Sequence, residues 1–81
     1  MQLEVLLFAA ARDAAGNDSV RIDVANDARA SDVIEAIGHK LPELSRLLPS
    51  CRLAVDCSYV TADALIPAEG EIALIPPVSG G

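Results

Sequence analysis

The chain has 81 residues, of which 52% are hydrophobic, so it has the composition of one small folded domain and not of a disordered segment. Its formal net charge is −6 and it has a single lysine, which argues against nucleic acid or a membrane surface as partner, because both require clustered Lys and Arg. The acidic residues are spread along the chain, which suits either a solvated surface or a basic protein partner.

The same composition bears on location, metals and cofactors. The opening residues 2–8 contain Glu4 and lack a basic region, and no apolar stretch reaches transmembrane length, so a cytoplasmic location is predicted. Cys51 and Cys57 are six residues apart and His39 is the only histidine, which is too few ligands for a zinc site. We therefore expect two reduced structural thiols and no metal. No glycine-rich phosphate loop is present.

The first predicted strand covers residues 2–8. Its alternation places Leu3, Val5 and Leu7 on one face, which is the expected core face. Phe8 ends the other, mixed face and is expected to be partly exposed.

A short alanine-rich helix is predicted over residues 9–15, with Gly16 as its C-terminal stop. Residues 19–24 alternate apolar and polar, which predicts a half-buried strand that pairs antiparallel with the first. The main helix is predicted to begin with Ser31 as its N-cap and to be ended or interrupted by Pro42, with apolar residues at helical spacing between them.

Three further strands are predicted over residues 52–55, 59–61 and 71–75, with a turn at 56–58. The last strand is nearly all apolar, so it is expected to be central and covered. This order predicts an α+β fold of the β-grasp (ubiquitin-like) type, in which one main helix packs across a mixed sheet of about five strands.

The most informative segment is the C-terminal one, Pro76-Pro77-Val78-Ser79-Gly80-Gly81. Prolines fix φ and favour an extended course, so a domain over residues 1–75 is expected to carry a projecting tail over residues 76–81, with a reach of roughly 20 Å. Glycine has no Cβ and can enter a narrow channel. The segment is interpreted as a slim tip that delivers the Gly81 carboxylate into another protein; the alternative is a frayed terminus.

Three segments of the chain resemble the family of molybdopterin synthase small subunits, which are ubiquitin-like sulfur carriers. They are residues 5–9 followed by Arg12, Asp13 and Gly16; residues 53–56, where the family frequently has asparagine in place of Asp56; and residues 70–81, the most similar of the three. An apolar strand followed by Pro-Pro-Val and a terminal Ser-Gly-Gly is a specific pattern. The resemblance extends over essentially the whole chain.

The resemblance implies that a ubiquitin-activating-like adenylyltransferase joins AMP to Gly81, which forms the reactive tip with Gly80. Sulfur transfer then converts the transient 1-glycyl-AMP into a 1-thioglycine, whose sulfur passes to cyclic pyranopterin monophosphate in molybdenum cofactor biosynthesis. No cofactor is expected to remain bound. The chain would be the non-catalytic sulfur donor of a heterotetramer, and the active site would lie on the large subunit.

The resemblance also implies which residues contact the large subunit: Phe8, Tyr59 and Ile75, together with Pro76, Pro77, Val78 and Ser79 of the tail. The family often carries phenylalanine where this chain has Leu74 and Ile75. Ordinary core packing is the alternative for the first three. Arg12 is expected either to pair with a carboxylate or to contact the partner.

Three other functions share these features. A sulfur carrier for thiamine or another pathway has the same fold and diglycine, but tends to be shorter and lacks Pro-Pro-Val. A ubiquitin-like protein modifier would join Gly81 to lysines of other proteins. A pure binding module would never react at Gly81.

Overall fold

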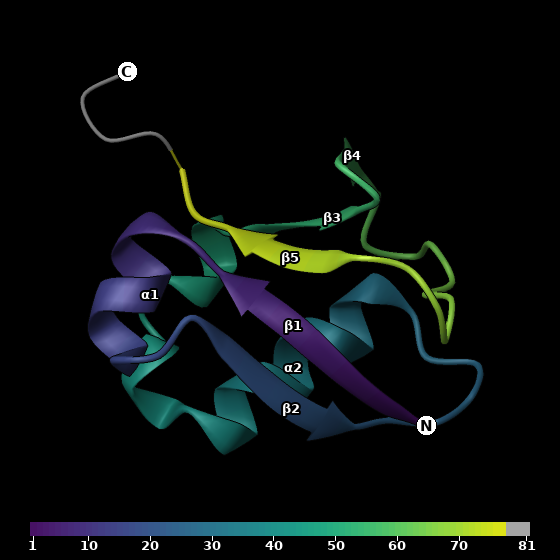
Figure 1. Ribbon diagram of the computed structural model, residues 1–81, viewed down its shortest axis with the longest axis horizontal. Coiled ribbons are helices and arrows are strands. Elements are labelled where there is room, and N and C mark those ends of the chain that lie inside the picture. The colour runs from purple at the N-terminus through teal and green to yellow at the C-terminus, as the bar shows by residue number, and fades with distance from the viewer. Residues whose placement is uncertain (78–81) are drawn as a thin grey trace.

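The structure is a computed structural model that describes residues 1–77. The predicted tail residues Val78, Ser79, Gly80 and Gly81 lie outside the described residues. Figure 1 shows the described elements, which in chain order are β1 (Gln2–Leu7), α1 (Ala9–Ala15), β2 (Ser19–Asp23), α2 (Ala30–Lys40), the 3-10 helices η1 (Pro42–Leu44) and η2 (Leu48–Ser50), β3 (Arg52–Val55), β4 (Ser58–Tyr59) and β5 (Ile72–Ile75).

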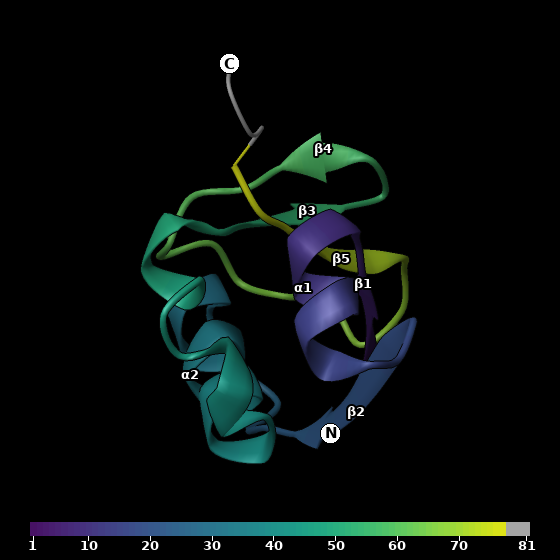
Figure 2. The ribbon, with the colours of Figure 1, turned by 90° about the vertical axis from the view of Figure 1, so that its left-hand side faces the viewer.

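The strands form one mixed sheet in the order β2-β1-β5-β3-β4. β1 is antiparallel to β2 and parallel to β5, and β3 is antiparallel to both β5 and β4. α2 lies on one side of this sheet, as the side view in Figure 2 shows. This arrangement confirms the predicted β-grasp fold, including the central position of the last strand.

The face of the sheet toward α2 forms the core. Leu3, Val5 and Leu7 of β1 are at most 3% exposed, which confirms the face predicted from their alternation. The core continues through the other strands and α2, with Val20, Ile22, Val33, Ile37, Leu53, Ile72 and Leu74. Each such side chain contributes about 1.5–3 kcal/mol when it is fully buried, and the almost complete lack of aromatics is met by this aliphatic packing.

The predicted bounds of the first helix are confirmed. Gly16 follows α1 with φ 73°, a left-handed conformation that costs glycine nothing, and its N–H donates to the Arg12 carbonyl at 2.9 Å.

The predicted N-cap of the main helix was wrong. α2 begins at Ala30, and Arg29 occupies the N-cap position. The backbone N–H groups of Ala30 and Ser31 donate to the carbonyls of Ala64 and Ala62, both at 2.9 Å. A loop from later in the chain therefore satisfies the N–H groups of the first two residues of α2.

Pro42 ends the main helix as predicted, because α2 stops at Lys40 and the Leu41 N–H makes the last bond, to the Ile37 carbonyl at 2.7 Å. The bounds of the hairpin strand were wrong: β4 covers Ser58–Tyr59, so it begins one residue earlier and ends two residues earlier than the predicted strand over residues 59–61. Asp56 and Cys57 have φ of 50° and 70° and alone form the loop, because a two-residue hairpin loop with positive φ at both positions matches the strand twist.

None of the helices within residues 1–77 is both long and apolar enough to cross a membrane.

Candidate functional site

β5 places the start of the predicted tail at the middle of the sheet. Ile75 is its last residue and is half-buried, Pro76 is buried, and Pro77 is exposed. Figure 1 shows the chain leaving the sheet directly at the end of this strand. Because β5 is held on both sides by β1 and β3, whatever follows Pro77 starts from a rigid base.

The sheet face turned away from α2 has a shallow depression at its centre, where the side chains are small. Ala54 of β3 and Ala73 of β5 lie directly opposite each other, and Tyr59 of β4 lies opposite Ala54. On the other side, Leu6 of β1 lies opposite Ala73. Because alanine side chains end at Cβ, the centre is shallow while the larger neighbouring side chains rise around it.

The result is a hollow of about 220 Å³, which we call the aromatic hollow. Its lining residues are Phe8, Ala54, Cys57, Tyr59, Glu71, Ala73 and Ile75. The structure thus brings together Phe8, Tyr59 and Ile75, three predicted partner-binding residues that come from separate parts of the sequence. The volume is below that of usual small-molecule pockets and suits a side chain of another protein better than a free ligand.

Both aromatic residues of the chain border this hollow and are exposed, Phe8 by 41% and Tyr59 by 56%. Core packing is therefore excluded for these two. The backbone of Phe8 is fixed although its ring is not buried, because its carbonyl accepts the N–H groups of Ala11 and Arg12 at 3.1 and 3.3 Å. Exposed aromatics gathered at one place are typical of a protein contact surface.

Arg52 sets the position of the Tyr59 ring. Its guanidinium carbon lies 4.4 Å from the ring centroid, a cation–π contact that stabilises exposed sites by about 0.5–1 kcal/mol. Arg52 also lies opposite Ile75 in the β3–β5 register. With Glu71 on the lining, the apolar centre has charged groups of both signs nearby, as a contact surface with a polar rim has.

The β3–β4 loop is tied to the start of β5. The Asp56 N–H donates to the Glu71 carbonyl at 2.8 Å, and the Glu71 N–H donates to Asp56 Oδ1 at 2.9 Å. Gly70 has φ 124°, and a Cβ there would lie 3.3 Å from both Asp56 carboxylate oxygens. These contacts hold Cys57 and Tyr59 at a set position relative to β5.

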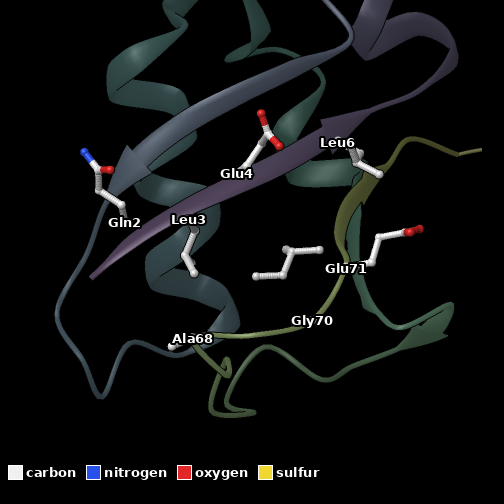
Figure 3. Close-up of a pocket in the computed structure, with 8 residues that line it drawn as sticks. Gln2, Leu3, Glu4, Leu6, Ala68, Gly70 and Glu71 are labelled. Carbon is white, nitrogen blue, oxygen red and sulfur yellow. The ribbon is translucent and has the colours of Figure 1, made fainter.

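A second hollow, of about 400 Å³, lies beside β1 and the beginning of β5 (Figure 3). Figure 3 shows the carboxylates of Glu4 and Glu71 pointing in different directions, and the lining has no basic or nucleophilic side chain. It therefore offers no chemistry of its own.

The cysteines are both free. Cys51 is buried, its thiol donates to the Leu47 carbonyl at 3.2 Å, and burial raises the pKa of that thiol, so it is less reactive than an ordinary cysteine. Cys57 is exposed beside the aromatic hollow. Within the described part of the chain, no cluster of three or more His, Cys, Asp or Glu could hold a metal ion.

Some residues around the aromatic hollow were missed by the sequence reasoning, namely Arg52, Ala54 and Ala73. Counting outward from the buried residues Leu53 and Leu74 with the two-residue period of a strand would have placed them on the outer face. Arg12, whose role stayed undecided, is exposed on α1.

The ThiS family model matches residues 5–81. This chain belongs to the ThiS family. It is similar to the molybdopterin synthase sulfur carrier subunit of Dictyostelium discoideum, with 40% identity over 99% of this chain and 96% of the relative. The corresponding subunit of Arabidopsis thaliana is 30% identical over all of this chain and 84% of its own length. These matches confirm the resemblance to molybdopterin synthase small subunits.

Solved structures give the same fold. SAMP1 from Haloferax volcanii superposes with a TM-score of 0.85 and 31% identity over the full length of both chains. The complex of subunits 1 and 2 of the molybdopterin-converting factor from Helicobacter pylori contains a chain with a TM-score of 0.68 and 26% identity, again over the full length of both.

Proposed function

We propose that this ThiS-family protein is the sulfur carrier subunit of a molybdopterin synthase. The observation that carries the proposal is the 40% identity to such a subunit over nearly the full length of both chains. The family match runs through residue 81, so it includes the diglycine. The exposed aromatic hollow beside the start of the tail supports the proposal further, because a carrier must dock while its terminus reaches elsewhere.

The proposed chemistry is confined to the Gly81 carboxylate. Such a group is ionised at neutral pH and is a poor acyl donor. Its oxygen attacks the α-phosphate of ATP, bound by an adenylyltransferase, and pyrophosphate leaves. Sulfide supplied by a sulfur donor then attacks the acyl carbon of the adenylate and AMP leaves, which yields a thiocarboxylate. The sulfur is passed to cyclic pyranopterin monophosphate on the large subunit, and water restores the carboxylate oxygen.

The described residues would do two things in this cycle. Phe8, Tyr59 and Ile75 would bind the large subunit, and the rigid base at Pro76 and Pro77 would aim the tail. Tethering raises the effective concentration of the sulfur at its acceptor, and it works only if the tail can span the gap from the docked domain. The relative from Helicobacter pylori was solved as a complex of two subunits, which supports a large-subunit partner.

The terminus provides the test. Removing Gly81, or adding one residue after it, is expected to abolish sulfur transfer in a reconstituted synthase while the thermal unfolding midpoint stays the same. Asp27→Asn, in the connection between β2 and α2, is the matched control and should leave transfer intact. Full transfer by either altered terminus would refute the proposal.

A second candidate function is protein modification. The two Haloferax volcanii structures of small archaeal modifier protein 1, SAMP1, are 31% and 29% identical to this chain. Both functions begin with the same acyl adenylate at Gly81. They differ in the nucleophile that accepts the acyl group, which is sulfur in one case and a lysine amine in the other. Isopeptide-linked adducts that appear with an activating enzyme, ATP and cell proteins would favour modification.

A further inference from the structure

β2 forms an edge of the sheet. Figure 1 shows it at the opposite edge from β4, and within residues 1–77 its only strand partner is β1. A hollow of about 490 Å³ lies between β2 and the last turns of α2, lined by Arg21, Ile22 and Asp23 of β2 and by Ala36, His39 and Lys40 of α2, with Gln2 of β1. An edge strand presents a row of backbone N–H and C=O groups to which another strand can pair.

The hydrogen bonds to β1 fix which backbone groups face outward. At one end the Leu7 N–H donates to the Asp18 carbonyl at 2.7 Å, and at the other the Val24 N–H donates to the Met1 carbonyl at 2.9 Å. In an antiparallel pair, hydrogen-bonded and non-bonded residue positions alternate along the strand. The backbone N–H and C=O groups of the even-numbered residues of β2 therefore point toward β1. The N–H and C=O groups of Ser19, Arg21 and Asp23 therefore point away from it.

Two copies related by a twofold axis can pair these outward groups only in antiparallel registers that match odd residues with odd residues. With the axis at Ile22, Arg21 of each copy lies opposite Asp23 of the other. With the axis one residue earlier, Arg21 faces Arg21, and one residue later, Asp23 faces Asp23. Opposite charges stabilise a cross-strand pair and like charges destabilise it, so the register centred on Ile22 is favoured.

The other face of the strand agrees with that register. Val20 would lie opposite Val24 of the second copy, and Ile22 opposite Ile22. Val24 is half-buried in one copy, and pairing would cover it further. Charged residues usually protect an edge from pairing, but here the two charges are opposite and two residues apart, so this one register neutralises them.

We infer that β2 is a self-association surface, through which two copies of this chain join their sheets antiparallel about Ile22. The inference is independent of the proposed function, because the aromatic hollow lies toward the opposite edge of the sheet and stays free in such a dimer. The buried surface is one short strand per copy, so a weak dimer that forms with rising protein concentration is expected.

Charge exchange tests the inference. Sedimentation velocity up to millimolar protein is expected to show a monomer–dimer equilibrium for the natural chain. Asp23→Arg alone and Arg21→Asp alone should each weaken self-association by about tenfold or more, because symmetry places two like-charged pairs in every dimer. Mixing the two variants should restore association, since the arginine introduced into one variant then faces the aspartate introduced into the other.

Matched controls carry the same charge changes elsewhere, namely Asp13→Arg on α1 and Arg46→Asp after η1, and they should dimerise like the natural chain. In the dimer, the Arg21 and Asp23 amides should also exchange hydrogen more slowly as concentration rises. A chain that stays monomeric at millimolar concentration would overturn the inference. So would dimers that survive both single charge reversals, or single variants that do not associate when mixed.

Discussion

Ala54 and Ala73 lie opposite each other on β3 and β5, and together they form the floor of the aromatic hollow. Both are only 6% exposed, yet neither faces α2. Their small size is what leaves room between Phe8, Tyr59 and Ile75. These two alanines therefore define the shape of the proposed docking surface.

Filling that floor should block docking. Ala73→Leu is expected to weaken binding to the large subunit by about tenfold or more, because the added side chain occupies the space that a partner side chain would enter. Isothermal titration calorimetry measures the affinity, and a far-ultraviolet melting curve checks the fold. Ala25→Leu, in the connection before α2, is the matched control. If Ala73→Leu binds the large subunit with unchanged affinity, the aromatic hollow does not take part in docking.

Phe8 should supply binding energy rather than stability. Phe8→Ala is expected to weaken the complex by about 1–3 kcal/mol, as for a contact residue of a protein interface, while the free energy of unfolding changes little because the ring is 41% exposed. Leu65→Ala removes another exposed side chain, outside the aromatic hollow, and should leave affinity unaltered. If Phe8→Ala instead lowers the free energy of unfolding and leaves the affinity for the large subunit unchanged, the ring stabilises the fold and does not contribute to binding.

The Asp56 carboxylate should stabilise the junction between the β3–β4 loop and β5. Asp56→Ala removes the acceptor of the Glu71 N–H, which is expected to cost about 0.5–1.5 kcal/mol in urea unfolding. Asp56→Asn keeps a side-chain acceptor and also tolerates the positive φ at this position, so it should cost much less. Equal losses for the two variants would show that this hydrogen bond contributes nothing.

Asp63 offers a prediction on pH. The hydrogen bond from Thr61 Oγ1, at 2.8 Å, is the main cause that lowers the pKa of Asp63, and Arg29 acts in the same direction. A lowered pKa in the folded state means that this carboxylate favours folding above its unfolded pKa, and that the contribution is lost as pH falls through the folded value. Thr61→Val should raise the pKa of Asp63, as measured by NMR titration of its carboxyl carbon. If the pKa of Asp63 is the same in Thr61→Val, the hydrogen bond from Thr61 is not the cause of the lowered pKa.

Much of the fold could be predicted because burial imposes a simple period on the sequence. Two examples are the alternation of Leu3, Val5 and Leu7 in β1 and the apolar run that begins at Ile72 in β5. Each pattern depends only on which side chains of that one strand are buried. The start of α2 could not be predicted in this way, because its first N–H groups bind carbonyls of Ala62 and Ala64, which only the folded chain brings near.

The same distinction applies to the candidate site. Phe8 and Tyr59 could be singled out because aromatics are rare in this chain. The contact of Arg52 with the Tyr59 ring depends on the register of β3 with β4, which a one-residue error in the hairpin loop had hidden. The predicted boundary between a domain over residues 1–75 and a tail over residues 76–81 stays a prediction.

Whether Gly81 carries sulfur can be decided by intact-protein mass spectrometry of the chain after incubation with ATP, a partner adenylyltransferase and a sulfur source. The expected result is a mass increase equal to the exchange of one oxygen for sulfur, located on Gly81 by fragmentation and absent without ATP. An unchanged mass when all three components are present would show that Gly81 does not carry sulfur.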